Sequence, residues 1–549
     1  MITRSGRRQR LASALAPIIV AGAVAIGLIA TARTAAAASA HDRAAAARDP
    51  AMLAADWLER GARRRFGPLS AAEIKLARSA PERALRWIGP SDDPNDPTNN
   101  PAHAASWGPD RTIRAAIIQW LLTDREASAL IHPSGLGIAG ARIVGRFDLS
   151  YQRVHAPLTI LASAIADGVD ISFAHLHSLD FGRDRVGPIA AEQAVVAGDV
   201  LMEGGVYGSA NFFRARIGGC LDFSGAQLNG AAPLAAVEAT IGSDVLFHQG
   251  FQTAGMLDFR LVTIHRSLSV HGARFIGTAP NGLNAGRATI AGALYWVEVA
   301  HTRTTVLDLN DARAQSVWDD AASWPAAGNL NLAGFVYDDF IGGPTDADAR
   351  LAWLRRQPRS LWADPQPYRQ LAQALRANGA EEDATRVEIA KETAMTDYGG
   401  LSFVHRLWRD ALRVTIGYGY RPLRALWWIA GFVATGTLLF GWGFRAGLIT
   451  PTEADAYEKF CRSGAPPAHY PPFSGFVYSL ENFLPIVDLH QGIYWRPNPR
   501  LEPTADAPTA AHKTATAWML RGYLWMHILA GWTITPLLFA GLTGLLHGG

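Results

Sequence analysis

Cysteine is nearly absent from this chain of 549 residues, and charged side chains are scarce. The two cysteines, Cys220 and Cys461, exclude a disulfide framework and a four-thiolate metal site. Charged residues make up 18% of the chain, below the roughly 25% usual in soluble proteins, and 49% of the residues are hydrophobic. The formal net charge of +3 gives no indication of a nucleic-acid partner. This composition argues against disorder and favours segments that lie in a membrane.

The N-terminus has the pattern of an export signal. Four arginines at positions 4, 7, 8 and 10 precede an uncharged run over residues 11–32. A run of about 20 residues can cross a bilayer, because a helix rises about 1.5 Å per residue against a core of roughly 30 Å. The small residues Ala38, Ser39 and Ala40 resemble a cleavage site. We therefore expect a signal peptide or signal anchor over residues 1–40, with an alanine-rich soluble helix as the alternative.

Two more uncharged runs lie near the C-terminus, over residues 425–444 and 522–546, the second broken only by His527. Both contain tryptophans, which prefer the headgroup region of a bilayer. These runs predict two transmembrane helices within a membrane domain over 401–549. A pair of buried core helices is the alternative, which their length without charge disfavours.

The positive-inside rule does not orient these helices. Five arginines crowd the entrance to the first run, and five basic residues lie in the loop between the two runs. Following the N-terminal segment instead, we expect a multi-pass protein of the bacterial inner membrane whose middle domain is periplasmic.

The middle of the chain, over residues 133–343, is a repeat. Apolar residues at 196, 217, 241, 264 and 290 occupy the centre of one alternating pattern and are separated by 21, 24, 23 and 26 residues. A period in the low twenties indicates a solenoid, and alternation with period 2 indicates strands. Counting back to position 143 leaves a gap of 53 residues, which predicts one degenerate copy, with 165–173 as the missing turn.

A finer spacing indicates a four-sided coil. Phe212, Ile217, Phe223 and Leu228 follow one another at intervals of 5, 6 and 5 residues. An apolar residue at about every fifth position would place one inward side chain on each side of a roughly square coil, and the small residues between them would leave room for the next coil.

These coils resemble pentapeptide-repeat right-handed β-helices, and residues 107–546 resemble a family of uncharacterised bacterial membrane proteins that join such a solenoid to a two-helix membrane domain. Members are sometimes described as membrane-associated oxidoreductases, and nothing in this sequence supports that activity. The resemblance implies a mainly β solenoid (a right-handed parallel β-helix, pentapeptide-repeat-like) with α-helical caps and C-terminal transmembrane helices. The matching stretches are Trp107–Arg114, Gly140–Gly145, Thr415–Pro422 and Tyr478–His490.

Helical segments are expected on both sides of the repeat. Over 41–132 a helical cap is predicted, with Ser70 and Glu73 as a capping box and Asp110 capping a helix through Leu121. Over 344–400 the spacing predicts a helical hairpin, with helices at 365–378 and 381–396. We interpret the hairpin as an adaptor, with a peptide-binding surface as the sharper alternative.

Two glycine motifs suggest chemistry that their context does not support. Gly135, Gly137 and Gly140 match the spacing of a dinucleotide-binding turn, but a strand and not a helix is expected to follow. Thr415–Gly419 reads like a potassium filter, yet it lies before the first C-terminal span and beside arginines. We interpret both as turns.

The segment 473–489, between the two spans, predicts an amphipathic helix with one apolar stripe. Pro485 would stop a helix that lies flat at the membrane interface. A re-entrant or pore-like element is the alternative.

Three aspartates of the repeat, Asp148, Asp170 and Asp222, are expected at equivalent strand positions that are not on adjacent coils. Glycoside hydrolysis needs a pair of carboxylates, but outward polar residues are ordinary on a solenoid. His175 and His177 are interpreted as a solvated pair, and Cys220 as a small residue near the coil core.

The sequence therefore predicts no catalytic, cofactor-binding or metal-binding residues. The leading hypothesis is a membrane-anchored β-helix scaffold without evident catalysis. The first alternative is an oligomeric channel or transporter subunit that uses 473–489, and the second is a glycan-acting enzyme. Expected partners are membrane lipid and other membrane or envelope proteins, with no nucleic acid.

Overall fold

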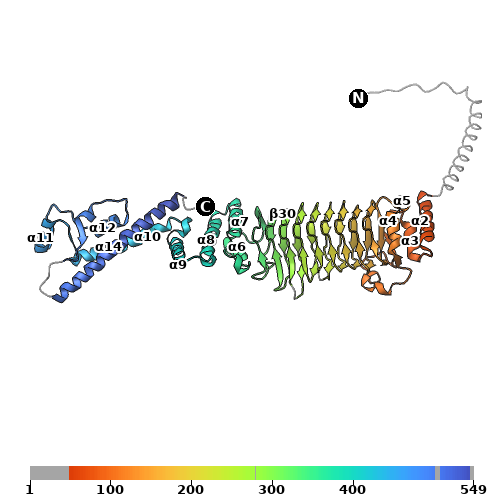
Figure 1. The fold of residues 1–549 in the computed structure, drawn as a ribbon, viewed down its shortest axis with the longest axis horizontal. Helices are drawn as coiled ribbons and strands as arrows, with labels where there is room; N and C mark the ends of the chain where they lie inside the picture. The colour runs from red at the N-terminus through yellow and green to blue at the C-terminus, as the bar shows by residue number, and fades with distance from the viewer. Residues whose placement is uncertain (1–48, 84, 231, 278–279, 501–506, 544–549) are drawn as a thin grey trace, which may run out of the picture. The chain divides into compact units, whose positions relative to one another are not determined.

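The computed structural model describes residues 49–83, 85–230, 232–277, 280–500 and 507–543 (Figure 1). The expected signal segment over 1–40 lies outside the described residues. The chain divides into two units, residues 1–242 and 243–549. Each unit is described by itself.

The first unit begins with short helices and two short strands. These are α2 (Pro50–Phe66), α3 (Ala71–Ser79), β1 (Arg86–Trp87), β2 (Thr112–Arg114), α4 (Ala115–Thr123) and α5 (Arg125–Ser128), with 3₁₀ turns at Pro97–Asn99 and Pro101–Ser106. The expected capping box of Ser70 and Glu73 is present. Burial raises the pKa of Glu73, but hydrogen bonds from Arg114 and Ser70 outweigh it, so that the pKa lies below its usual value.

The expected helix cap at Asp110 is wrong. Residues 112–114 form β2, which pairs in parallel with the first full coil at 142–144, and α4 begins only at Ala115. Residues 112–114 are extended and not helical because the strand continues the ladder of hydrogen bonds of the coil. From α4, the Gln119 amide donates to the Asp148 carbonyl at 2.6 Å, which places this helix over the start of the coils. The helices thus cover a solenoid end whose strand edges would otherwise be open.

Four columns of parallel strands form the coils of the first unit. One column holds β3 (Leu136–Ala139), β7 (Leu158–Leu161), β11 (Leu179–Gly182), β15 (Val200–Leu201) and β19 (Leu221–Asp222). The next holds β4 (Arg142–Val144), β8 (Ala164–Ile165), β12 (Arg185–Val186), β16 (Val206–Tyr207) and β20 (Gln227–Leu228). The third holds β5 (Phe147–Asp148), β9 (Val169–Asp170), β13 (Ile189–Ala190), β17 (Ala210–Asn211) and β21 (Leu234–Ala235). The fourth holds β6 (Arg153–Val154), β10 (His175–Leu176), β14 (Val195–Val196), β18 (Arg216–Ile217) and β22 (Thr240–Ile241).

This arrangement explains the gap of 53 residues in the sequence pattern. Ile143 pairs with Ile165, which pairs with Val186, whereas Val196 pairs with Leu176 and Ile217 in another column. Position 143 therefore does not belong to the series that starts at 196, and the expectation of one degenerate copy is wrong. Because each side of the coil repeats nearly the same five-residue pattern, the sequence could not distinguish one side from the next.

The second unit continues with coils of the same kind. Its strands are β23 (Val245–Phe247), β24 (Gln252–Thr253), β25 (Met256–Asp258), β26 (Thr263–Ile264), β27 (Leu268–His271), β28 (Arg274–Phe275), β29 (Asn281–Asn284), β30 (Thr289–Val297), β31 (Thr305–Asp308), β32 (Arg313–Asp319), β33 (Leu330–Asn331) and β34 (Asp339–Gly342). Strand pairing is again parallel. The prediction of a parallel β-solenoid is confirmed, with about nine turns among the described residues.

Helix α6 (Ala347–Leu354) closes the last coil of the second unit. Arg350, fully buried, donates from both terminal nitrogens to the Asp319 carboxylate at 2.8 Å, and its guanidinium lies 3.6 Å from the centre of the Phe340 ring. The expected hairpin follows as α7 (Pro365–Ala377) and α8 (Glu381–Tyr398). The Gln370 amide of α7 donates to the Tyr337 carbonyl, so the hairpin is joined to the same coil.

The C-terminal part of the second unit is helical. It contains α9 (Phe403–Ile416), α10 (Arg424–Arg445), α11 (Ala454–Ser463), α12 (Gly475–Phe483), α13 (Gln491–Tyr494) and α14 (Ala507–Leu542), with a small antiparallel pair of β35 (Ile449–Pro451) and β36 (Trp495–Pro497). Two helices, Arg424–Arg445 and His512–Leu542, are long and apolar enough to cross a membrane.

Candidate functional site

The aspartates of the solenoid are residues of a structural corner. Asp148 and Asp170 pair across β5 and β9 on neighbouring coils, whereas Asp222 lies in another column opposite Leu201. The expectation of equivalent positions is therefore wrong for Asp222, and the expectation that none of the three is on an adjacent coil is wrong for Asp148 and Asp170. The carboxylates of Asp148 and Asp170 accept hydrogen bonds from the backbone N–H two residues later, at 2.9 and 3.0 Å.

The same corner recurs without a carboxylate. In the first unit Asn211 caps the N–H of Phe213, and in the second unit Asn284 caps that of Gly286. The backbone adopts a positive φ at the third residue after the capping residue, as at Phe173 (59°) and Arg214 (54°). Since an asparagine serves equally well, the corner needs a hydrogen-bond acceptor and not an acid.

The other motifs of the solenoid also have structural roles. Gly135 and Gly140, both with positive φ, flank strand β3, and the next element is strand β4 and not the helix that a dinucleotide site needs. His175 and His177 are exposed. Burial, together with Asp199, raises the pKa of Cys220 to about 12, which leaves its thiol protonated. Among the described residues, no group of three or more histidine, cysteine or acidic side chains could hold a metal ion.

Within the motif Thr415–Gly419, the first two residues end α9, and Gly417–Gly419 form the turn that leads to α10. Gly417 ends α9 in the left-handed conformation with φ 57°, and Tyr418 is buried. The guanidinium of Arg409 lies 5.4 Å from the centre of the Tyr418 ring. The Ile416 and Gly417 carbonyls accept hydrogen bonds from the N–H groups of Arg421 and Tyr420 at 3.1 Å, so these oxygens serve the turn and not an ion.

A buried polar site lies where α12 meets the two long apolar helices. Helix α12 ends at Phe483, because Pro485 cannot continue it, so it is shorter than the expected 473–489. Helix α12 contacts both long helices, α10 and α14, and does not lie flat against the outside of the pair. Its Ser479 hydroxyl donates to the carbonyl of Val433 in the middle of α10, and the Ser479 carbonyl lies 3.0 Å from Nε2 of His527 in the middle of α14.

Glycines permit this approach. A β-carbon on Gly436 of α10 would overlap with the Ser479 hydroxyl, and one on Gly531 of α14 would overlap with the Phe483 carbonyl oxygen. A β-carbon on Gly475 would lie 2.9 Å from the Thr437 carbonyl. Small residues that allow backbones to approach closely are typical of helix packing in membranes.

A buried histidine completes the site. His527 is fully buried, and its ring packs against Phe432, Phe440 and Phe483 with centre-to-centre distances of 5.1–6.3 Å. Its Nδ1 lies 3.5 Å from the Tyr523 hydroxyl. Sequence reasoning noted His527 only as an interruption of an apolar run, and its polarity in that run was the signal for a partner.

The chain turns back after α12. The Glu481 carboxylate accepts hydrogen bonds from the backbone N–H groups of Gln491 and Gly492 at 2.7 and 3.0 Å, and the Gln491 side chain accepts from Ser474 N–H at 3.1 Å. Residues 484–490 therefore return to the point where α12 began. Together with α12 they form a hairpin that enters and leaves the helix pair on the same side.

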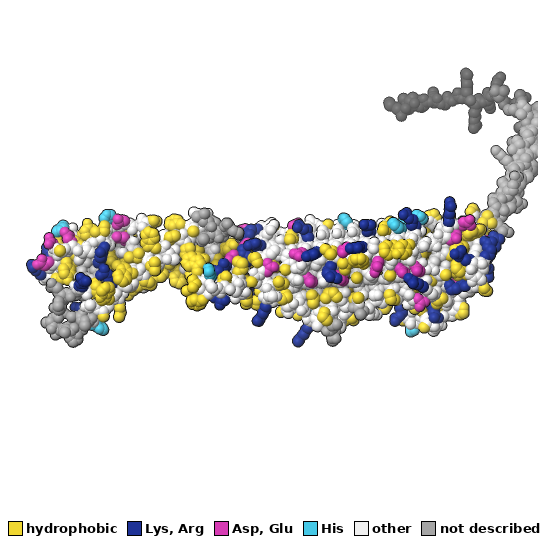
Figure 2. Space-filling model, viewed as in Figure 1, with side chains coloured by type: hydrophobic (Ala, Val, Ile, Leu, Met, Phe, Trp, Pro, Cys, Tyr) yellow, Lys and Arg dark blue, Asp and Glu magenta, His cyan; other side chains and the backbone are white. Residues whose placement is uncertain are grey.

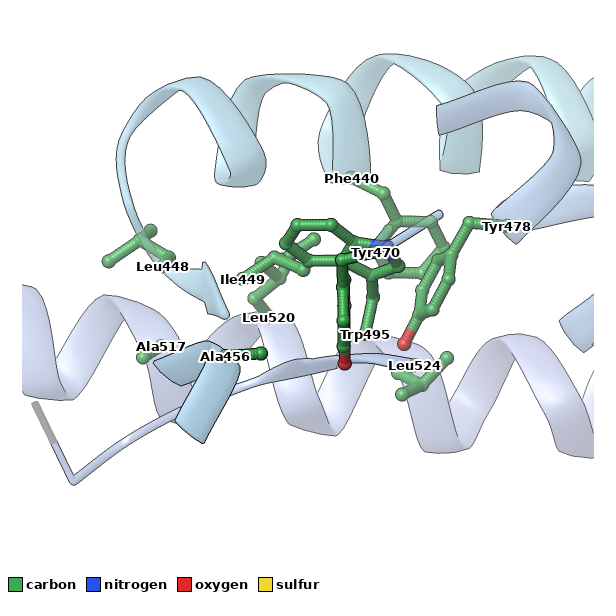
Figure 3. Packing of buried hydrophobic residues seen from close by; sticks show 10 residues of the cluster. All are labelled: Phe440, Leu448, Ile449, Ala456, Tyr470, Tyr478, Trp495, Ala517, Leu520 and Leu524. Carbon is green, nitrogen blue, oxygen red and sulfur yellow. The ribbon is translucent and has the colours of Figure 1, made fainter. Parts of the chain in front are cut away.

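An apolar cluster lies where α10 ends and α14 begins. It joins Phe440 of α10, Tyr478 of α12 and Trp495 of β36 with residues of α14 (Figure 3). The Trp495 indole donates to the Pro471 carbonyl at 3.1 Å. The full cluster contains Phe440, Leu448, Ile449, Ala456, Tyr470, Tyr478, Trp495, Ala517, Leu520 and Leu524.

The outer faces of the helix pair are apolar and exposed. Trp427 is 82% exposed, Leu438 74% and Met519 73%. Figure 2 shows hydrophobic side chains gathered over these helices. A surface of this kind is unfavourable in water and typical of a helix that contacts lipid.

No protein-family model, curated protein or solved structure matches this chain.

Proposed function

We propose that this protein is a membrane-anchored scaffold in which the β-solenoid is a rigid surface for other membrane or envelope proteins. The observation that carries the proposal is the contrast between a regular, capped solenoid and a pair of helices that expose large apolar side chains. A solenoid offers long, regular faces suited to binding extended partners. The described residues contain no metal-ligand group, and the polar corners serve the backbone.

The finer features of the proposal come from the sequence. The coils are right-handed and of the pentapeptide-repeat type, and the chain belongs with uncharacterised bacterial proteins of that design. The protein is multi-pass in the inner membrane, an N-terminal signal directs its export, and the solenoid lies in the periplasm.

Two measurements test the anchor and the orientation. After carbonate washing, the full chain is expected to remain with the membrane pellet, because two apolar helices hold it there. Protease added to spheroplasts is expected to degrade the solenoid. A chain that washes off would contradict the anchor, and a solenoid protected until lysis would contradict only the orientation.

Copurification from detergent-solubilised membranes tests the scaffold role. Full chain and a variant that lacks residues 403–549 are compared, and proteins retained by both are expected to bind the solenoid. A full chain that retains no protein above background contradicts a scaffold.

A second candidate is an oligomeric channel or transporter subunit. The hairpin of α12 supports it, since irregular backbone at membrane depth is tolerated where it is buried in protein or lines water. Ile486, 74% exposed, lies on the return segment and would face a second copy. Two spans cannot enclose a pore, so the candidate requires an oligomer. A monomer in detergent without conductance in planar bilayers would contradict it.

The glycan-acting alternative has less support, because both carboxylates of the neighbouring pair Asp148 and Asp170 are engaged by backbone N–H groups. Asp148→Asn with Asp170→Asn keeps those acceptors. Loss of a cell-wall glycan cleavage activity in that variant, at unchanged stability, would favour the enzyme over the scaffold.

A further inference from the structure

Helix α9 has two distinct sides. One side is tied to α8, since Arg409 donates to the hydroxyl of Thr396 at 2.8 Å and forms an ion pair with Glu392. The other side is apolar and open to solvent. Its exposed fractions are 80% for Phe403, 72% for Val404, 60% for Leu407, 49% for Trp408 and 57% for Val414. These positions follow one another along a single stripe of the helix.

The apolar side of α9 is continuous with the start of α10. The Trp428 indole donates to the Val414 carbonyl at 3.3 Å, which joins the end of α9 to the first turns of α10. Leu423, Leu426 and Trp427 are exposed beside it. A β-carbon on Gly541 would lie 2.8 Å from Pro422, so the end of α14 lies beside the start of α10. The apolar side of α9 thus lies where both candidate spans reach one membrane surface.

A basic cavity lies beside the start of α10. It has a volume of about 410 Å³, and its lining includes four arginines, Arg355, Arg386, Arg421 and Arg424, together with Trp362 and Tyr398. Arg386 pairs with Asp348 and Asp383, and Arg421 lies 3.8 Å from Glu382. For Arg355 and Arg424, the described part of the chain supplies no carboxylate within ion-pair distance. Asp397 also lines the cavity. Since Arg386 and Arg421 have carboxylate partners, Arg355 and Arg424 are the two lining arginines open to an anionic ligand.

We propose that α9 lies in the headgroup layer with its apolar side among acyl chains, and that the adjoining cavity holds the phosphate of an anionic phospholipid. This inference rests on the proposed membrane anchor. Lipid is the occupant that fits, because the apolar side is continuous with helices that cross the bilayer and is flanked by arginines on α9 and α10. Guanidinium groups bind phosphate in a planar, bidentate geometry.

Spin labels test the depth of α9. In full-length protein with Cys220→Ser and Cys461→Ser, single labels are placed at Val404→Cys and, as a control on the solenoid, at Ile341→Cys, which is 44% exposed in the native chain. In vesicles of phosphatidylglycerol and phosphatidylcholine, the label at 404 is expected to be more accessible to oxygen than to a water-soluble nickel chelate, and the label at 341 the reverse. Nickel accessibility at 404 equal to that at 341, or spin–spin broadening at 404 from a second copy, would overturn the proposal.

Lipid retention tests the cavity. Arg355→Gln with Arg424→Gln is compared with Arg274→Gln with Arg303→Gln, two exposed arginines of the solenoid. In nanodiscs, the cavity variant is expected to bind phosphatidylglycerol about thirtyfold more weakly than wild type, since the two removed basic groups together contribute about 2 kcal/mol. The control variant should match wild type, and inorganic phosphate should not compete with the lipid. Unchanged affinity in the cavity variant, or full competition by inorganic phosphate, would overturn the lipid site. Either result would leave carbonate resistance intact, so the anchor is tested separately.

Discussion

The solenoid buries its large apolar side chains, whereas the C-terminal helices expose many of theirs. Phe181, Phe223 and Phe259 of the coils are at most 1% exposed. Trp427 and Leu438 of α10 point outward, while inside the helix group glycines such as Gly436 and Gly531 bring the backbones together beside clusters of buried apolar side chains. In water, burial of apolar surface holds the coils together. Between lipid-facing helices that driving force is absent, so close backbone packing and hydrogen bonds replace it.

This contrast has a consequence for mutation. Large-to-small changes should harm the solenoid most, and small-to-large changes should harm the helix group most.

The largest effect is expected for Gly531→Ala in α14. The new methyl group would overlap with the Phe483 carbonyl and displace α12, with a cost of more than about 3 kcal/mol. The control is Gly522→Ala in the same helix, where a β-carbon meets no atom within 4 Å and alanine favours helix. Limited proteolysis of the detergent-solubilised protein should show a destabilised C-terminal part only for Gly531→Ala. Equal behaviour of the two variants would contradict the packing of α12 between the helices.

The next effect is expected in the coils of the first unit. Phe212→Ala removes a ring that is 1% exposed, and we expect a loss of about 3–5 kcal/mol in unfolding free energy. The neighbouring ring of Phe213 faces outward beside the Arg214 guanidinium at 4.8 Å, and Phe213→Ala should cost about 1 kcal/mol or less. Denaturant unfolding followed by far-ultraviolet circular dichroism measures both. A larger loss at 213 than at 212 would reverse the assignment of inward and outward positions.

A buried acid makes the first unit sensitive to pH. Asp184 is 1% exposed, one carboxylate oxygen has no hydrogen-bond partner, and burial raises its pKa well above the usual value. Burial and the charge of Glu203 likewise raise the pKa of Asp180 to about 6. In the unfolded chain both groups titrate near 4. The contribution of these two groups to stability is therefore greatest below that value and falls as the pH rises, over about pH 4 to 6 for Asp180.

Asp184→Asn should remove much of this dependence. At pH 7 we expect the variant to be more stable than wild type by about 1–3 kcal/mol, and the difference should vanish near pH 4. Asp199→Asn is the control, because Asp199 is exposed and asparagine can still accept the hydrogen bond from Cys220 N–H. A stability difference between Asp184→Asn and wild type that does not grow from pH 4 to pH 7 would contradict the buried, protonated Asp184.

The smallest effect is expected at a corner of the coil. Asp170→Ala loses the hydrogen bond from Ser172 and the ion pair with Arg146 at 2.8 Å, with a cost of about 1 kcal/mol. Asp170→Asn should cost less, since it keeps the backbone acceptor. Burial raises the pKa of Asp170, but Ser172 and Arg146 outweigh it and the pKa is lowered. This contribution is therefore present above the unfolded pKa and is lost as the pH falls. Alanine and asparagine variants of equal stability would show that the corner does not depend on the acceptor.

Much of the solenoid could be predicted from one-dimensional patterns. Inward residues such as Phe212 and Ile217 recur at nearly fixed intervals, because every coil must bury the same positions. The column to which Ile143 belongs could not be predicted, because all four sides share nearly one pattern and only the pairing with Ile165 resolves it. For the same reason the neighbouring positions of Asp148 and Asp170 were missed.

The sequence by itself determined that the chain contains stacked strands and two apolar helices, since periodicity and the length of uncharged runs are local properties of the chain. Tertiary structure alone decided that α12 lies between those helices and that His527 meets Ser479 there. These contacts join residues 48 positions apart through glycines whose importance no local pattern reveals, because a glycine that lets two backbones meet reads the same as one that meets nothing.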